Sequence, residues 1–197
     1  DGKPLGHDDI RYGNSYNASK LFFLSTYGNM AHHSDYRMMV KANVEDLVTV
    51  LTYFTGWICY MSSSSVNLPV QTPYSRTKRA AEEILQALPE LKSCIVRPYS
   101  VTGVGEQKEH LIPNLNRPCM KGEPMDFLPD ATHDFIDVED VVKAIIDVKH
   151  PGVYEVGSGI SHTNQQVKQE VEYITGRKIN VNIVKDLREY DNSDWES

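Results

Sequence analysis

The sequence predicts an α/β fold built on a parallel sheet. Three short, almost wholly apolar runs, at residues 20–26, 57–61 and 93–98, have the length and composition of buried strands. Between them lie two longer segments with helical character, at residues 36–54 and 74–88. Strands that are apolar throughout and alternate with helices are typical of a parallel sheet with helices packed against it.

Each element of the first half has its own local signal. Residues 20–26 run into a polar loop at 27–29, and residues 57–61 end in a run of serines at 62–65. Apolar residues of the first helix recur every three or four positions, as one face of a helix requires. They are Met39, Val40, Val44, Leu47, Val48 and Leu51.

The sequence marks the start of the second helix, and after Gly105 it marks the start of a second lobe. Thr72 suits the N-cap position, and Pro73 suits the first helical position. We divide the chain into a domain at 1–105 and a lobe that makes up most of 106–197. Some strand and helix segments of 106–197 are expected to pack back into the core of the first domain. The segments expected there are a short helix in 106–117, strands at 125–128, 152–157 and 178–184, and helices at 138–148 and 163–175, the last closed by Gly176.

Bulk composition excludes several classes of protein. The chain has 197 residues, 40% of them hydrophobic, and a net charge of −7, so it lacks the basic surface expected of a nucleic-acid-binding protein. Its apolar runs fall short of the ~20 residues that span a membrane. Cys59, Cys94 and Cys119 lack metal-ligand spacing. Cys59 and Cys94 lie in apolar runs and read as core thiols of a reducing compartment, which favours the cytoplasm. His32 and His33 are adjacent and cannot share one metal from a regular helix, so no metal is predicted.

Tyr74 and Lys78 form the most informative pair of residues. They are four positions apart at a helix start, so both side chains lie on one helix face. A cation about 4 Å from a phenolate, at an effective dielectric near 20, stabilises it by roughly 4 kcal/mol. The pKa of the tyrosine is then expected to fall from near 10 toward roughly 7, which suits a general base. An exposed helix face also produces such a pair by chance.

Polar residues at three strand ends strengthen the functional interpretation. Residues 24–26, 62–65 and 98–100 all lie at the carboxyl ends of predicted strands. In parallel sheets, ligands bind beyond the carboxyl ends of the strands. We therefore expect these segments to converge near the start of the Tyr74 helix.

Together these residues resemble the extended short-chain dehydrogenase/reductase family, in particular its NAD-dependent sugar-nucleotide epimerases and dehydratases of the UDP-glucose 4-epimerase kind. The matches occur in the family's order and span most of the chain. They are Leu24-Ser25-Thr26, Asn43-Val44, Met61 to Val66, Tyr74 with Lys78, Arg97 to Gly105, Leu111-Ile112-Pro113, Lys121 to Pro124, Asp134 to Val141, Tyr154 to Gly159, and Arg188 with Asp191.

The resemblance implies a Rossmann-like sheet, a small C-terminal substrate-binding lobe and hydride transfer between NAD, rather than NADP, and a sugar carbon. Tyr74 would deprotonate a sugar hydroxyl, Lys78 would hold the cofactor ribose, and Ser63 would bond the reacting hydroxyl. The implied cofactor-binding residues are Asp9, Ile10, Leu24, Ser25, Thr26, Asn43, Ser62, Tyr74, Lys78, Pro98 and Tyr99. The implied substrate-binding residues are Ser63, Ser64, Ser100, His133, Arg188 and Asp191.

Departures from the family pattern narrow the reaction. The dehydratases carry an Asp-Glu pair where this chain has Ser64 and Ser65, and serine cannot supply that acid and base chemistry. Epimerisation, or simple oxidation and reduction, is therefore favoured. Ser100 replaces an asparagine and His133 an arginine of the family pattern, which puts substrate contacts in question.

The sequence also lacks the family's G-x-x-G-x-x-G pyrophosphate loop. We therefore expect a Rossmann sheet that is incomplete at its N-terminus, and a homodimer that covers the exposed sheet. Two alternatives stay open beside the epimerase or oxidoreductase. One is a shortened, non-catalytic member that binds a nucleotide sugar or a partner protein. The other is a family reductase that acts on a different carbonyl substrate.

Overall fold

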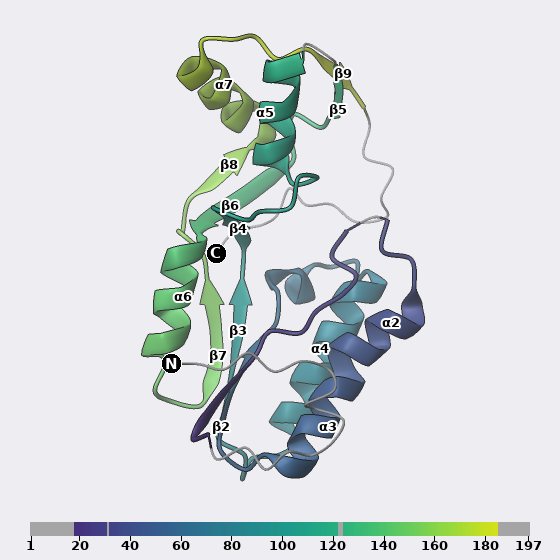
Figure 1. Ribbon diagram of the computed structural model, residues 1–197, viewed down its shortest axis with the longest axis vertical. Coiled ribbons are helices and arrows are strands. Elements are labelled where there is room, and N and C mark those ends of the chain that lie inside the picture. The colour runs from purple at the N-terminus through teal and green to yellow at the C-terminus, as the bar shows by residue number, and fades with distance from the viewer. Residues whose placement is uncertain (1–17, 31, 122–123, 185–197) are drawn as a thin grey trace. The chain divides into compact units, whose positions relative to one another are not determined.

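The computed structural model divides the chain into two compact units (Figure 1). The residues that it describes are 18–30, 32–121 and 124–184. Of these, unit 1 contains 18–67, 71–97 and 148–154, except residue 31, and unit 2 contains 68–70, 98–147 and 155–184, except 122–123. Each unit has its own hydrophobic core.

Unit 1 is built on a four-stranded sheet with the strand order β1-β2-β3-β7, of which only Pro98 and residues 155–156 belong to unit 2 (Figure 1). Its strands are β1 (Lys20–Phe23), β2 (Trp57–Met61), β3 (Ser93–Pro98) and β7 (Gly152–Val156). β2 runs parallel to both β1 and β3, with Phe23 opposite Tyr60 and Met61 opposite Val96. The predicted parallel α/β sheet is confirmed. β1 is shorter than the predicted strand because its pairing with β2 ends at Phe23.

The helix predicted at 36–54 forms as one rod with a change of winding inside it. It consists of α2 (Tyr36–Val40), the π-helical turn η1 (Lys41–Glu45) and α3 (Asp46–Tyr53). Asp35 caps its start by accepting a hydrogen bond from the Met38 N–H at 3.0 Å. The rod packs along α4 through α2 and η1 (Figure 1). The π turn is a feature that hydrophobic periodicity did not predict.

Helix α4 (Pro73–Gln86) starts as predicted. Thr72 is the N-cap and accepts a hydrogen bond from the Ser75 N–H at 3.2 Å, and Pro73 occupies the first turn. One apolar cluster joins α3 and α4 to the sheet, and its burial is the main stabilising term of unit 1. Its buried members are Phe23, Leu47, Val50, Phe54, Ile58, Tyr60, Ala81, Leu85 and Ile95.

Two of the three cysteines are buried in this sheet. Cys59 and Cys94 are free thiols that lie opposite each other on β2 and β3. Their predicted burial is confirmed, while the side chain of Cys119 lies outside the described residues.

Unit 2 contains two small sheets and three helices. The sheets are β4 (Ser100–Thr102), β6 (Thr132–Asp137) and β8 (Ser161–Thr163) in the order β4-β6-β8, and β5 (Met125–Phe127) paired with β9 (Val181–Ile183). The helices are α5 (Leu111–Lys121), α6 (Val138–Asp147) and α7 (Asn164–Thr175). β4 is parallel to β6 and β8 is antiparallel to it, and the second pair is parallel.

Helix α7 shows why its ends were predictable. Thr163 and Gln166 form a capping box, in which each side chain bonds the other residue's backbone N–H. Gly176 ends the helix at φ +65°, a left-handed conformation that favours glycine. The core of unit 2 is formed by Leu115, Met125, Phe127 and Ile179.

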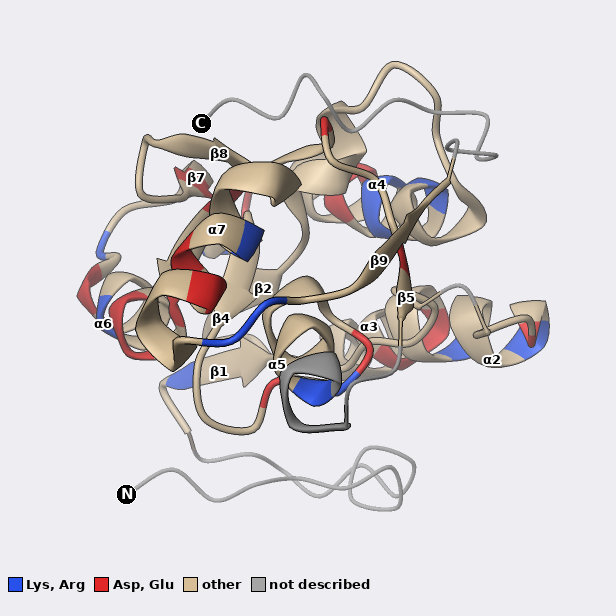
Figure 2. Ribbon diagram, turned by 90° about the horizontal axis from the view of Figure 1, so that it is seen from above, with Lys and Arg blue, Asp and Glu red and all other residues tan. Residues whose placement is uncertain are grey.

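Charged residues of both signs are distributed over the helices. α4 and α6 each carry basic and acidic residues, as Figure 2 shows. Among the described residues, the helices are too short or too polar for any of them to cross a lipid bilayer.

Candidate active site

The Tyr74 phenol lies where two strand ends meet the start of α4. Its side chain is hydrogen-bonded to the side chains of Thr26, which follows β1, and Ser63, which follows β2. Because β1 and β2 are parallel, both residues leave the same edge of the sheet. Unit 1 therefore brings Thr26, Ser63 and Tyr74 together from three separate elements.

Lys78 lies one helical turn beyond Tyr74 on α4. Its ammonium donates to the Met61 carbonyl at 2.9 Å and to the Ser25 carbonyl at 3.4 Å, and the residue is 1% exposed. Its Nζ lies 6.0 Å from the centroid of the Tyr74 ring and 5.1 Å from that of the Tyr60 ring. The two residues share one helix face, as their spacing predicted.

The predicted fall in the pKa of Tyr74 is wrong for this structure. Burial raises the pKa of the Tyr74 phenol above its usual value, and the hydrogen bonds to Thr26 and Ser63 offset only part of that rise. Burial also lowers the pKa of Lys78 to about 7, against the opposing field of Glu82. The predicted fall assumed a fully charged ammonium about 4 Å from the phenol. It did not include the loss of solvation on burial, which disfavours both the phenolate and the ammonium. With a pKa of about 7, the buried ammonium is itself only partly protonated at neutral pH.

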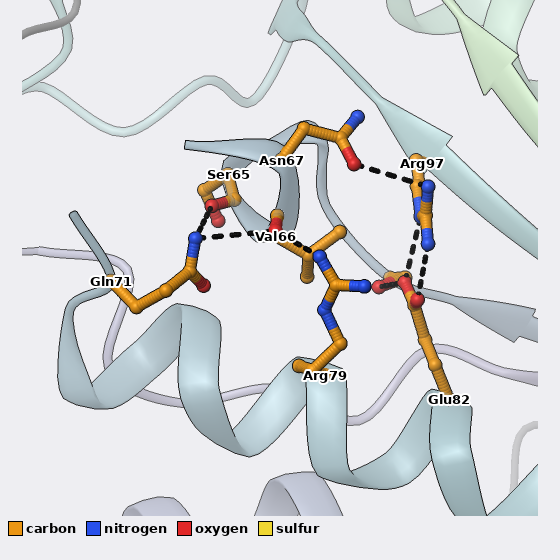
Figure 3. Close-up of polar contacts among 8 residues, drawn as sticks. Ser65, Val66, Asn67, Gln71, Arg79, Glu82 and Arg97 are labelled. Atoms are coloured by element: carbon orange, nitrogen blue, oxygen red, sulfur yellow. Dashed lines mark hydrogen bonds and ion pairs between the residues drawn. The ribbon is translucent and has the colours of Figure 1, made fainter. Parts of the chain in front are cut away.

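A buried ion pair supports the serine turn that carries Ser63. The Glu82 carboxylate accepts hydrogen bonds from Arg97, at 3.0 Å to Nε and 2.6 Å to Nη2, and from the Ser62 hydroxyl. The Glu82 side chain is 1% exposed and that of Arg97 13%. Figure 3 shows the two side chains facing each other. This two-pronged contact joins α4, β3 and the end of β2.

Further side chains bond to the turn from outside. The Val66 carbonyl accepts hydrogen bonds from Arg79 and from Gln71, the latter at 3.2 Å, and Gln71 also reaches the Ser65 carbonyl at 3.4 Å (Figure 3). Arg97 Nη1 donates to Asn67 at 3.1 Å. The turn, which includes the 3-10 helix η2 (Ser64–Asn67), is therefore held at successive residues.

Asn43 was predicted to contact a cofactor, but its side chain faces inward. It is fully buried in the π turn, accepts from the Tyr27 N–H at 2.9 Å and donates to the Tyr27 carbonyl at 2.8 Å. It also donates to the Thr77 hydroxyl at 2.9 Å, which in turn donates to the Tyr74 carbonyl at 2.8 Å. Asn43 therefore connects the loop after β1 to the start of α4.

Ser62 and Ser64 are buried as well. Ser62 donates to Glu82 and so points into the ion-pair network and not toward an open site. The Ser64 hydroxyl is buried with no hydrogen-bond partner among the described residues. Leu24 has an apolar side chain that is 55% exposed, and Ser25 contributes its carbonyl to Lys78.

The remaining predicted residues lie elsewhere. Ser100 and His133 are within hydrogen-bonding distance in unit 2, 2.9 Å between Oγ and Nδ1. Pro98 and Tyr99 also belong to unit 2, where the Tyr99 N–H donates to the Val156 carbonyl at 3.0 Å. Asp9, Ile10, Arg188 and Asp191 lie outside the described residues.

Sequence reasoning missed two residues of this arrangement, Glu82 and Ser65. Glu82 follows Lys78 by four positions, so helical spacing alone placed it on the face of Tyr74 and Lys78. Ser65 gave no comparable signal, because serine contacts within a turn depend on its exact winding. In the described part of the chain, histidine, cysteine and carboxylate side chains nowhere cluster in a group of three that could hold a metal ion.

Comparison with known proteins gave two kinds of result. A sequence profile described as "NAD dependent epimerase/dehydratase family" matches residues 36–157. No match was found among curated proteins.

Solved structures with similar folds include three enzyme complexes. MoeE5 in complex with UDP-glucuronic acid and NAD is 22% identical, with a TM-score of 0.76 over 86% of this chain and 66% of that chain. The UDP-glucuronic acid 4-epimerase from Bacillus cereus, in complex with UDP-glucuronic acid and NAD, is 18% identical, with a TM-score of 0.78 over 88% and 65%. RMD from Pseudomonas aeruginosa, complexed with NADPH, is 19% identical, with a TM-score of 0.73 over 87% and 69%. At these identities the likeness shows the fold.

Proposed function

Because the chain belongs to the NAD-dependent epimerase/dehydratase family, we propose that it carries the proton-transfer site of an NAD-dependent epimerase or oxidoreductase that acts on a nucleotide-diphosphate sugar. The observation that carries the proposal is the Tyr74 phenol, hydrogen-bonded by Thr26 and Ser63 with Lys78 one turn away. In this role, Tyr74 exchanges a proton with a sugar hydroxyl or carbonyl, and Ser63 turns its one hydroxyl proton from the Tyr74 oxygen to the same sugar oxygen when a sugar binds.

The charge state of the site favours one direction of proton transfer. With its pKa raised by burial, the Tyr74 phenol is protonated at neutral pH and is ready to donate to a carbonyl that is being reduced. Taking a proton from a hydroxyl requires further stabilisation of the phenolate. We therefore expect the oxidation of the sugar to accelerate with rising pH more than the reduction.

The donors of unit 1 fit a nicotinamide cofactor. Two of the three N–H donors of Lys78 have partners in the described part of the chain, which leaves one for a ribose hydroxyl. Thr26, which is exposed, adds a hydroxyl at the same sheet edge. When bound, NAD would accept a hydride from the sugar carbon and return it. We propose NAD over NADP, as the family resemblance implies.

The nucleotide-sugar class has a separate basis. Two of the similar structures hold UDP-glucuronic acid, which supports a nucleotide-diphosphate sugar as the substrate here. Ser100 and His133 of unit 2 supply paired polar groups of the kind that bind sugar or phosphate oxygens. Unit 2 as the sugar-nucleotide lobe, a homodimer and a cytoplasmic location stay predictions.

The test combines binding with turnover. The purified chain is titrated by calorimetry with NAD, NADP and UDP-glucose, UDP-N-acetylglucosamine or UDP-glucuronic acid, and mixtures are analysed for epimers and for NADH absorbance. Tyr74→Phe keeps the ring but loses the proton, so turnover should fall by about 10²–10⁴-fold with binding little changed. Tyr173→Phe, on an exposed residue of α7, is the matched control.

Three results would count against the proposal. The first is that the chain binds neither a cofactor nor any of the sugar nucleotides. The second is that Tyr74→Phe turns over substrate as fast as the unaltered chain. Binding of a sugar nucleotide without turnover in the unaltered chain would instead favour the non-catalytic alternative.

A further inference from the structure

We infer that Ser65 is a positioning residue that fills both acceptor positions of the Ser63 hydroxyl and so directs the Ser63 proton at the Tyr74 oxygen. Its meaning for catalysis rests on the proposed function, but the hydrogen-bond arrangement does not. Ser65 lies two residues after Ser63, in the 3-10 helix that follows β2, and is 9% exposed.

The contacts of Ser63 carry the inference. The Ser65 backbone N–H donates to Ser63 Oγ at 3.2 Å, and the Ser65 hydroxyl donates to the same oxygen at 2.9 Å. A serine hydroxyl has two acceptor positions and one proton. Both acceptor positions are thus taken by one neighbour, and the proton of Ser63 is what remains for a third partner.

That third partner is the Tyr74 side chain. Because the Ser63 oxygen accepts from Ser65 twice, Ser63 acts as the donor in its bond to Tyr74. A donor aimed at the phenol oxygen favours the phenolate over the phenol. The proton of Tyr74 itself is then left to point at Thr26 or at a substrate oxygen. Ser65 in this way sets the direction of the hydrogen bond in the site.

The surroundings hold Ser65 in this position. Gln71 bonds the Ser65 carbonyl and, with Arg79, the Val66 carbonyl, while Arg97 bonds Asn67 (Figure 3). The bonds from Gln71 and Arg79 reach backbone carbonyls and the bond from Arg97 reaches the Asn67 side chain, so the Ser65 N–H and hydroxyl are left for Ser63. The turn therefore has little freedom to rotate the two donors away.

The experiment measures the ionisation of Tyr74 directly. Tyr74 is replaced by 3,5-difluorotyrosine, a more acidic phenol, so that one ¹⁹F resonance reports its pKa during a pH titration. The ionisable neighbours, Lys78 on α4 and Tyr60 on β2, are the same in every variant. Ser65→Ala frees one acceptor position of Ser63, which then also accepts from the phenol. The pKa should rise by about half to one unit, the size of one neutral hydrogen bond.

A double-variant cycle makes the test specific. Ser63→Ala should raise the pKa at least as much, and adding Ser65→Ala to it should change nothing further. Ser65→Cys, with its weaker donor, should give an intermediate rise and serves if the alanine variant fails to fold. Ser93→Ala, at the opposite end of the neighbouring strand, is the matched serine control and should leave the resonance unchanged.

The inference is overturned if Ser65→Ala leaves the pKa of residue 74 unchanged, or shifts it equally with and without Ser63. The titration needs neither cofactor nor substrate. If the chain is inactive but its variants show the predicted pKa changes, the proposed function fails and the inference about Ser65 stands. If the chain is active but the pKa changes are absent, the inference fails and the proposed function stands.

Discussion

Glu82 in unit 1 and Glu172 in unit 2 are both nearly buried carboxylates surrounded by donors, yet they serve different parts of the molecule. Glu82 is bonded by Arg97 and Ser62, whose neighbours carry the serine turn beside Tyr74. Glu172 is bonded by Lys168 at 2.9 Å, by Lys178 at 3.4 Å and by the Ile179 N–H at 2.7 Å, all local to the end of α7. The same chemistry therefore supports a candidate site in one unit and only a helix end in the other.

The largest effect is expected from Glu82→Gln. Without the carboxylate, the largely buried Arg97 guanidinium loses its opposing charge, and removing one partner of such a pair costs about 3–5 kcal/mol of stability. Urea unfolding measures the loss. Glu83→Gln changes the exposed neighbour on the same helix and should cost less than about 0.5 kcal/mol. Equal losses for the two variants would show that the buried pair has no special weight.

Lys78→Met tests the pH dependence of unit 1. The pKa of Lys78 is about 7 in the folded chain and 10.5 in the unfolded chain, so between these values the unfolded chain holds one more proton. Stability should then rise with pH from 7 to 10.5, by at most about 1.4 kcal/mol per pH unit.

In the methionine variant that contribution to the slope disappears. Urea unfolding at several pH values checks it, with Lys92→Met, an exposed lysine of the same unit, as the control. A slope that persists in Lys78→Met would assign it to another group.

Glu172→Gln should lower the stability of unit 2 by less than Glu82→Gln lowers that of unit 1. The contribution of Glu172 is lost at low pH, in a different pH range from that of Lys78. Its donors lower the pKa of Glu172 from 4.5 to about 2, so the stabilisation is complete above 4.5 and is lost as the pH falls toward 2. At pH 7 the variant should lose about 1–2 kcal/mol, because solvent around the 88% exposed Lys178 side chain screens part of the interaction.

Near pH 2 and below, the variant and the unaltered chain should converge. Acid unfolding of both, with the exposed Glu170→Gln as control, measures the difference. A deficit that stays constant down to pH 2 would mean that the charge of Glu172 is not what stabilises the helix end.

The smallest losses of stability are expected from replacing the N-cap residues of one helix in each unit. Thr72 caps α4 and Thr163 caps α7, and replacing either by alanine should cost about 1 kcal/mol. Only Thr72→Ala should shift the ¹⁹F resonance of residue 74, because only that cap sits beside the phenol. A comparable shift in Thr163→Ala would show that the helix cap of unit 2 also affects the environment of Tyr74.

Much of the fold was predictable because its signals are local. Apolar runs located β2 and β3, and Thr72, Pro73 and Gly176 marked helix ends through their backbone preferences. The three-residue strands β4 and β8 escaped prediction because a strand that short is defined by its partner, β6, and not by its own composition. The π turn likewise depends on tertiary contacts of Asn43.

The candidate site was predictable as a set of positions but not as an electrostatic environment. Spacing alone put Tyr74 and Lys78 on one face, yet the direction of their pKa changes depends on burial, which a sequence does not display. Ser62 was placed at the right strand end, but only the packing of Glu82 shows that its hydroxyl turns inward.

The π turn at Lys41–Glu45 makes the length of the first helix as important as its composition. A π turn holds i→i+5 hydrogen bonds and so contains one residue more than an α turn. A single-codon deletion at Ala42 should therefore convert the turn to α-helix and keep α2 and α3 in register, with Met39, 3% exposed, still facing the interior. The deletion removes the local widening that places Asn43 against Thr77, so the loop bearing Thr26 should loosen, and the ¹⁹F resonance of a deletion variant would report that change.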